Sequence, residues 1–314
     1  MNIQRNSKFT IQLLLAALTL GQRLGHAAEG AASYYFPGAA GSFAVAVAPP
    51  GGFTLVNQTV IYNARTSRAV LSGRAVADLE VNAVYNYTGG LYSVTPVAGG
   101  TFAMGGFVPF GHMAIKGIVT GPNGATTRAK VSDFNIGDVV LVPASLHWNN
   151  KGSVHFKIAQ NIVAPTGHYN IDSRANVGRN YWAFDTNAAL TYLNMKRGFE
   201  TSIAPGVQFN LKNPDTDYKT GNEFHTDFMI NQFLSKNFAL GVHAYYYNQF
   251  TADSGSGAVL GAFQGKAFGW GPALLWSPKQ TAGKLNITAK WMQDVHSKNR
   301  LRASYAAIVV AFKL

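Results

Sequence analysis

The chain has 314 residues, no cysteine and a formal net charge of +12 at neutral pH. Without cysteine, disulfides and thiol chemistry are excluded. The composition combines 33 Gly, 20 Phe, 14 Tyr and 5 Trp with a mean hydropathy of +0.02. Glycine and aromatic residues at neutral hydropathy are typical of a transmembrane β-barrel, whose strands face lipid on one side and water on the other. A secreted β-sandwich is the alternative fold.

The N-terminus has the features of a secretory signal peptide. Arg5 and Lys8 precede an apolar run at 11–20, and the small residues Ala27 and Ala28 follow. This is the order of charged, apolar and cleavage regions in a signal peptide. The run is too short for a membrane span, which needs ~20 apolar residues. We predict a signal peptide at 1–27, cleavage after Ala27 or Ala28, and Sec-type export.

Residues 28–52 are small, glycine-rich and apolar, and they precede the first expected strand. We predict that they form a periplasmic segment or enter the barrel lumen. A disordered tail is the alternative, because chain ends without anchoring contacts are often disordered. The remaining residues, 53–314, form the predicted barrel domain.

Alternation with a period of two runs through the rest of the chain. In "YWAFDTNAALTYLN" the aromatic and aliphatic side chains share one face, while Asp185, Asn187 and Thr191 share the other. Segments of about 11 to 14 such residues exceed the ~5 to 6 of soluble sheets and suit tilted membrane strands. The pattern predicts an all-β, antiparallel barrel of about 12 strands, at 53–65, 76–88, 98–119, 125–149, 152–164, 181–194, 198–211, 222–234, 237–250, 263–277, 283–295 and 301–313.

The connections between these strands alternate in length. Short turns such as "NNK", "MKR" and "SK" alternate with longer loops such as "KNPDTDYKTG" and "TADSGSGAVLGA". Short periplasmic turns and long outer loops are the usual asymmetry of outer-membrane barrels. We therefore predict the outer membrane of a Gram-negative bacterium as the location, with both termini on the periplasmic side.

The glycines of "QFTADSGSGAVLGAFQG" resemble a phosphate-binding loop, but no helix follows them and no Lys-Ser or Lys-Thr pair is present. Phosphate loops need a helix N-terminus facing the anion, so we interpret this stretch as a loop between two strands. Gly257 and Gly261 are expected to permit positive φ or tight folding back toward the pore mouth, and Asp253 and Ser254 to bond nearby amides. We predict a gating loop formed by Asp253, Ser254, Gly255, Gly257 and Gly261.

Four blocks in order, "NIGDVVLVPASLHW", "APTGHYN…NVGRNYWAFDTNAALTY", "YKTGNEFHTDFMINQFL" and "YNQFTADSGSGAVLGAFQGKAFGWGP", carry a family resemblance over most of the mature chain. The chain resembles the meta-pathway phenol-degradation family of outer-membrane proteins. The resemblance implies an outer-membrane β-barrel associated with the catabolism of phenol and other aromatic compounds, which assists uptake of hydrophobic substrates. It supplies no site residues.

The strand register places a mixed set of acids, bases and amides in the lumen. Such residues suit a water-filled interior or a network that closes the barrel. Tyr245 and Tyr247 suit an aromatic solute, although an interfacial aromatic girdle is the alternative. The predicted lumen or substrate path comprises His147, His155, Asp185, Glu200, His225, Asp227, His243, Tyr245, Tyr247, Gln249, Lys284 and Lys290. The register also turns Asn82, Asn86, Lys157, Asn161, Asn187 and Gln208 inward.

The sequence predicts passive uptake of hydrophobic or aromatic solutes rather than catalysis. It has no Gly-x-Ser-x-Gly or His-Glu-x-x-His motif, and we expect no catalytic residue, metal or cofactor. A structural or adhesive barrel with a closed lumen is the alternative, and a lipid-modifying hydrolase is a further one. The expected partners are membrane lipid, lipopolysaccharide, the barrel assembly machinery and a small solute. Nucleic acid is not expected, because no recognition module is present.

Overall fold

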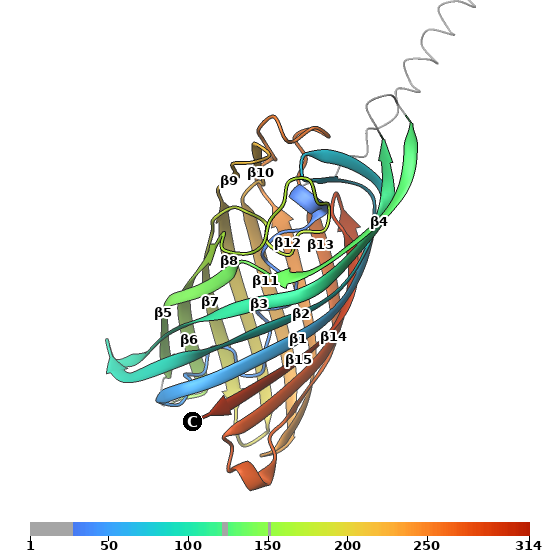
Figure 1. Cartoon of the computed structure of the whole chain (residues 1–314). Coiled ribbons are helices and arrows are strands. Elements are labelled where there is room, and N and C mark those ends of the chain that lie inside the picture. The colour runs from blue at the N-terminus through green and yellow to red at the C-terminus, as the bar shows by residue number, and fades with distance from the viewer. Residues whose placement is uncertain (1–27, 121–124, 150–151) are drawn as a thin grey trace, which may run out of the picture.

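The computed structural model describes residues 28–120, 125–149 and 152–314. Within these ranges the chain is an antiparallel barrel closed by twelve strands, in the ring order β2-β1-β15-β14-β13-β12-β11-β8-β7-β6-β5-β3 and back to β2 (Figure 1). The predicted all-β transmembrane barrel of about 12 strands is confirmed. The predicted signal peptide at 1–27 lies outside the described residues. No helix in the described ranges is long and apolar enough to cross a membrane.

Most strands follow the predicted ranges closely. Their bounds are β1 (Gly52–Leu71), β2 (Arg74–Val97), β3 (Gly100–Thr120), β4 (Thr126–Ile136), β5 (Val139–Asn149), β6 (Val154–Ala164), β7 (Ala183–Asn194), β8 (Phe199–Asn210), β11 (Glu223–Ser235), β12 (Phe238–Gln249), β13 (Lys266–Trp276), β14 (Leu285–Lys298) and β15 (Arg302–Lys313). The short pair β9 (Lys212–Asn213) and β10 (Tyr218–Lys219) forms a separate hairpin, and two 3-10 turns are η1 (Glu29–Ala31) and η2 (Lys279–Thr281).

The barrel has two distinct ends. The longer connections 165–182, 211–222 and 250–265 gather at one end, which we call the loop end. The shorter connections 195–198, 236–237 and 277–284 lie at the opposite end, the turn end, together with Gly52 and the C-terminus. The asymmetry that the loop lengths predicted is therefore present in the fold.

Side chains sort between the two faces of the barrel wall as the alternation requires. Leu190, Ile230 and Trp291 are 46%, 58% and 47% exposed on the outside, whereas Glu200 and Asp227 are buried inside. An outward apolar face with a polar interior matches strands that cross a lipid bilayer.

The predicted strand 125–149 is two strands, and this correction has a clear physical cause. The chain breaks at Gly137 and Asp138 between β4 and β5. The buried Asp138 carboxylate accepts hydrogen bonds from the backbone N of Gly167 (2.9 Å) and of Arg179 (2.5 Å) and from the Tyr34 hydroxyl (2.6 Å). β4 pairs with β3 in the described residues, while β5 continues the ring to β6.

The face assignment of β2 also needs correction. Val81, Tyr85 and Tyr87 point to the interior, where they line a cavity, so the predicted inward residues Asn82 and Asn86 face outward. Asn86 Nδ2 donates there to Thr59 Oγ1 at 2.9 Å. β2 inverts the usual polarity because its inner face packs on an apolar segment of the chain rather than on water.

Candidate functional site in the barrel lumen

Residues 28–51, which we call the N-terminal segment, run through the lumen from one end to the other (Figure 1). At the loop end the backbone N of Ala28 donates to Asp253 Oδ2 at 2.7 Å. At the turn end the backbone N of Ala48 donates to Asn149 Oδ1 at 3.0 Å. We expected both termini on the side of the short turns, and for Ala28 this expectation is wrong.

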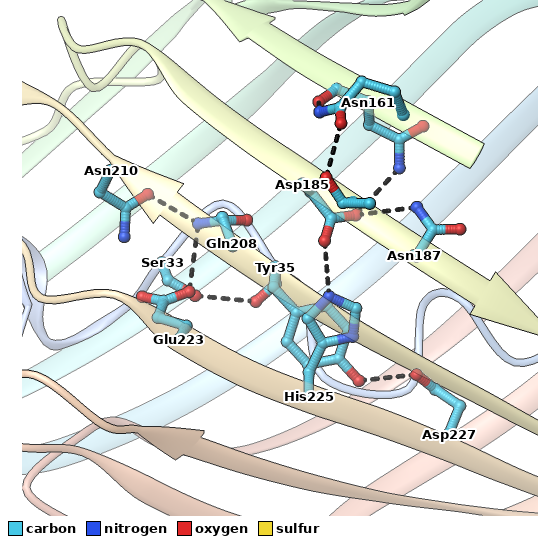
Figure 2. Close-up of polar contacts among 12 residues, drawn as sticks. Ser33, Tyr35, Asn161, Asp185, Asn187, Gln208, Asn210, Glu223, His225 and Asp227 are labelled. Atoms are coloured by element: carbon cyan, nitrogen blue, oxygen red, sulfur yellow. Dashed lines mark hydrogen bonds and ion pairs between the residues drawn. The ribbon is translucent and has the colours of Figure 1, made fainter. Parts of the chain in front are cut away.

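Tyr35 anchors the middle of the N-terminal segment to β11. Its hydroxyl donates to Asp227 Oδ2 at 2.8 Å, and its ring stacks on His225 with the centroids 3.8 Å apart (Figure 2). His225 Nε2 lies 2.9 Å from Asp185 Oδ1. Asn161 and Asn187 donate to the other oxygen of Asp185. The network therefore continues from the segment through β11 to β7 and β6.

A second polar group lies beside it, between β8 and β11. Gln208 Nε2 donates to Asn210 Oδ1 at 2.8 Å and to Glu223 Oε2 at 3.1 Å (Figure 2). Ser33 of the N-terminal segment lies next to Glu223 in the same view. Buried charges and amides are stable where hydrogen bonds satisfy them, and here the segment completes the polar interior.

Lys290 on β14 holds the tight bend of the segment. Its Nζ donates to the carbonyl oxygens of Gly38 (2.5 Å) and Gly41 (2.8 Å). Gly38 has φ +82°, and a Cβ there would lie 2.7 Å from the Tyr305 hydroxyl. Glycine is therefore required at the bend, because any side chain would meet both backbone strain and a steric clash.

A cavity of about 170 Å³ lies between the N-terminal segment, strands β1 to β3 and the loop at 165–182. Its aliphatic walls include Leu71, Val81, Met113 and Ile115. Its aromatic walls are Tyr34, Tyr35, Phe36, Tyr62, Tyr85, Tyr87, Tyr169 and Tyr181. Arg174, Arg179 and Arg300 also line it, and the Arg179 guanidinium carbon lies 5.7 Å from the centre of the Tyr34 ring.

Ten of the twelve predicted path residues lie in the barrel interior, around the N-terminal segment. The remaining two lie at the turn end: His155 is partly exposed, with Nδ1 3.1 Å from Asn149 Oδ1, and Lys284 is exposed in the bend before β14. The prediction of Lys284 as a lumen residue is wrong, because β14 begins one residue later. The interior residues are His147, Asp185, Glu200, His225, Asp227, His243, Tyr245, Tyr247, Gln249 and Lys290.

Several of these ten residues have partners that the sequence did not indicate. His225 and Asp227 of "FHTDF" both contact Tyr35, and His225 Nε2 pairs with Asp185 rather than with Asp227. Tyr245 donates to Asp294, and the Tyr247 ring lies under the Arg300 guanidinium at 4.1 Å. Both tyrosines are buried, so they do not belong to an interfacial girdle.

His147, Glu200 and His243 each have at least one hydrogen-bond partner within the lumen. His147 Nε2 lies 2.9 Å from Ser145 Oγ, and Nδ1 lies 3.3 Å from the carbonyl oxygen of Ala46. Glu200 accepts from the Ser202 hydroxyl at 2.8 Å. His243 Nε2 lies 3.0 Å from Asn231 Oδ1.

The glycine loop at 250–265 packs on the neighbouring loop at 211–222. Ser254 forms a β-bridge with Lys219, and Gly255 and Gly261 have φ +92° and +114°. Gly261 thus has the expected positive φ, whereas Gly257 permits tight folding, because a Cβ there would lie 2.1 Å from the Thr216 carbonyl oxygen. Asp253 bonds the distant amides of Ala28 and Gly221 rather than nearby ones.

Burial shapes the electrostatics of the loop end. It raises the pKa of Glu29 above its usual value, although hydrogen bonds from Asn213 and Thr216 oppose the shift. It also raises the pKa of Asp253, against hydrogen bonds led by that from Tyr218. Both carboxyls lie beside the N-terminal segment and are removed from water. They therefore take up a proton more readily than exposed carboxyls do.

Sequence reasoning missed three contributors. Arg179 lies in the loop at 165–182, and its Nη1 donates to the carbonyl oxygen of Ala32 at 3.0 Å. Asp138 and Glu29 were not selected. The aromatic run "SYYFPG" stands within a segment of otherwise small residues. This run is the signal that could have indicated packing of the segment inside the barrel, because large aromatic rings gain stability when they are buried.

The family model described as "Putative MetA-pathway of phenol degradation" matches residues 64–309. The chain belongs to this family. Among solved structures, an outer membrane channel from Pseudomonas putida F1 is similar with a TM-score of 0.67 and 16% identity, over 84% of this chain and 96% of that one. At 16% identity, this similarity shows only that the two chains share the barrel fold. No curated protein matches the chain significantly.

Two autotransporter barrels are also similar. The β domain of BrkA from Bordetella has a TM-score of 0.48 and 8% identity, over 84% of this chain and 100% of that one. The translocator domain of NalP from Neisseria meningitidis has a TM-score of 0.45 and 11% identity, over 85% and 90% of the two chains.

Proposed function

We propose that this phenol-degradation family member is an outer-membrane channel for passive uptake of small hydrophobic and aromatic molecules. The observation that carries the proposal is the tyrosine-lined cavity of about 170 Å³ inside the barrel. An engineered apolar cavity of roughly 150 Å³ admits benzene, so the cavity suits a single aromatic ring. The family description and the Pseudomonas putida channel, named as such, support the proposal.

The chemistry of the walls favours a ring with one polar substituent. Tyrosine rings offer flat apolar faces, and their hydroxyls offer hydrogen bonds to a phenolic oxygen. Met113 and Ile115 add apolar contact, while Arg179 and Asp138 supply a donor and an acceptor at the rim.

The N-terminal segment is the proposed gate. It fills the lumen between the interior residues of β7, β11 and β14, so movement of this segment widens the path. The glycine loop with Asp253, Ser254, Gly255, Gly257 and Gly261 acts as part of the gate by holding the segment's first residue. The interior acids, bases and tyrosines named above would then line the opened path.

We propose that the loop end faces the outside of the cell and the turn end faces the periplasm, after Sec-type export and insertion by the barrel assembly machinery. Lipid would surround the apolar outer face. The exposed basic residues near the loop end, including Arg68 and Arg74, suit the phosphates of lipopolysaccharide.

Blocking the cavity tests the proposal. Cells that express the protein take up radiolabelled phenol, toluene or benzoate, and Ile115→Trp projects an indole into the cavity. The matched control is Val108→Trp on the outward face of the same strand, β3. We expect Ile115→Trp to lower aromatic uptake several-fold and Val108→Trp to leave it unchanged at equal barrel yield. Equal uptake with and without the protein would favour the structural or adhesive barrel instead.

A further inference from the structure

One buried carboxylate at the loop end has four donors and no cation. Asp253 is 2% exposed. Oδ2 accepts from the backbone N of Ala28 and from the Tyr218 hydroxyl, both at 2.7 Å, and Oδ1 accepts from the backbone N of Gly221 at 3.0 Å and from Gln249 Nε2 at 2.7 Å. These four hydrogen bonds favour the ionised form of Asp253 and oppose the rise in its pKa that burial causes, and no cation among the described residues balances its charge.

Asp253 has no cationic partner among the described residues. The ion pairs in the described ranges involve Asp172, Asp217 and Asp185, and none of them includes Asp253. Buried charges are normally paired. A cation at one of the four donor positions would complete the site, and Tyr218, Gly221 and Gln249 supply neutral donors only. Ala28 N is the position where a cation is chemically available.

The backbone of Ala28 points to the same position. Ala28 has φ +65° and ψ 146°, a region that residues with a Cβ rarely adopt. The φ angle is defined by the carbonyl carbon of the preceding residue. If Ala28 is the first residue of the chain, no such carbonyl exists and the strain is removed. Ala28 is also buried in the loop end, at 2% exposure.

The sequence before Ala28 fits processing at this bond. Gly25 and Ala27 occupy the third and first positions before it, the small-x-small arrangement that signal peptidases cleave. We propose that a signal peptidase hydrolyses the Ala27–Ala28 bond and that the α-ammonium group so formed on Ala28 binds the Asp253 carboxylate, locking the N-terminal segment in the lumen.

The hydrolysis provides the cation. Water adds across the amide: the Ala27 carbonyl carbon takes the oxygen and leaves as a carboxylate, and the Ala28 nitrogen takes up the protons. An α-amino group has a pKa of about 7.7–8.0, and a nearby carboxylate favours its charged form. The Ala28 nitrogen is then an ammonium at neutral pH, in place of an amide N–H.

This ion pair goes beyond the proposed function, because it does not depend on which molecule passes through the barrel. It would join the first residue of the mature chain to two loops at once: Asp253 lies in 250–265, and Tyr218 and Gly221 lie in 211–222. A precursor that retains its signal peptide has an amide at Ala28 and lacks this ion pair. Export processing and closure of the lumen would thereby be coupled.

The test uses the full-length protein exported to the membrane and purified in detergent. N-terminal sequencing identifies its first residue, and an aldehyde reagent selective for α-amines at neutral pH measures how exposed that residue is. Asp253→Asn removes the carboxylate charge, and Asp172→Asn makes the same change at an exposed loop position. We expect a chain that starts at Ala28, with labelling at least about tenfold slower in the wild type and Asp172→Asn than in Asp253→Asn.

Two results would overturn the inference. The first is a mature chain that begins at any residue other than Ala28. The second is a folded wild-type protein whose α-amine reacts as fast as that of the same protein unfolded in urea. This second comparison needs no variant, so it decides the matter even if Asp253→Asn fails to fold. Neither readout depends on solute uptake, and a failed uptake assay therefore leaves this test intact.

Discussion

Tyr35 and His225 stack face to face inside the barrel, with planes 12° from parallel and ring centres 3.8 Å apart. Tyr35 belongs to the N-terminal segment, and His225 belongs to β11 of the barrel wall. The Tyr35 hydroxyl also donates to Asp227, two residues along the same face of β11. The contact joins the proposed gate to the wall at mid-lumen.

Tyr35→Phe should loosen the gate without removing the ring. It leaves the stack on His225 in place but removes a hydrogen bond to a charged group, which contributes about 1.5–3 kcal/mol. We expect the open fraction in single-channel recordings to rise roughly tenfold or more. Tyr246→Phe on the outward face of β12 is the control, and a similar rise there would contradict the role assigned to Tyr35.

Lys290→Met should release the bend of the N-terminal segment. Methionine keeps most of the side-chain volume but donates no hydrogen bond, so the carbonyls of Gly38 and Gly41 lose their shared partner. We expect higher conductance and faster proteolysis within residues 38–41. Lys284→Met, at an exposed position near the start of the same strand, should change neither. Unaltered proteolysis in Lys290→Met would show that other contacts hold the bend.

Glu29 should make closure depend on pH. Burial raises the pKa of Glu29 in the docked segment, whereas a released Glu has a pKa of about 4.3. Docking then takes up a proton between these two pKa values, so this group favours closure as the pH falls from neutral and the gain is complete below the lower pKa. Glu29→Gln should close the lumen more fully than wild type at pH 7, with the difference vanishing near pH 4.

The measurement is conductance of the two proteins from pH 4 to 8, expressed as a ratio so that other titrating groups cancel. In Glu29→Gln the amide can still accept from Asn213, as Oε2 does at 3.0 Å. A ratio that stays constant across this range would rule out the role of Glu29.

Asp138→Ala should destabilise the break between β4 and β5. The substitution leaves the amides of Gly167 and Arg179 and the Tyr34 hydroxyl without their acceptor. Each bond to a charged acceptor contributes about 1.5–3 kcal/mol, so the urea midpoint of unfolding should fall clearly. Asp172→Ala, at an exposed site, is the matched control and should unfold like wild type.

Strand alternation predicted the barrel well because a membrane imposes one rule on every strand: apolar residues face lipid. The faces of "YWAFDTNAALTYLN" follow that rule, and Leu190 and Asp185 lie on opposite sides as expected. The rule fails at β2, where Tyr85 and Tyr87 face an apolar part of the N-terminal segment and Asn86 faces out. A local pattern does not reveal which partner fills the interior.

The contacts that define the candidate site were less predictable for the same reason. Tyr35 with Asp227, and Ala28 with Asp253, join residues about 190 and 225 positions apart in the chain. The N-terminal segment has no periodic pattern from which its path could be inferred. The local sequence does not predict the break at Asp138 either, because Asp138 accepts hydrogen bonds from a loop some 30 to 40 residues later in the chain.

The path of the N-terminal segment constrains the order of assembly. The segment runs directly into β1, and β1 closes the ring by twelve residue pairs with β15, from Thr54 with Lys313 to Arg65 with Arg302. Its hydrogen-bond partners come from β5, β7, β11, β14 and β15. A segment so widely bonded is most easily placed while the β1–β15 seam is still open. The β-sheet would then close around the N-terminal segment, which serves as a template for the barrel.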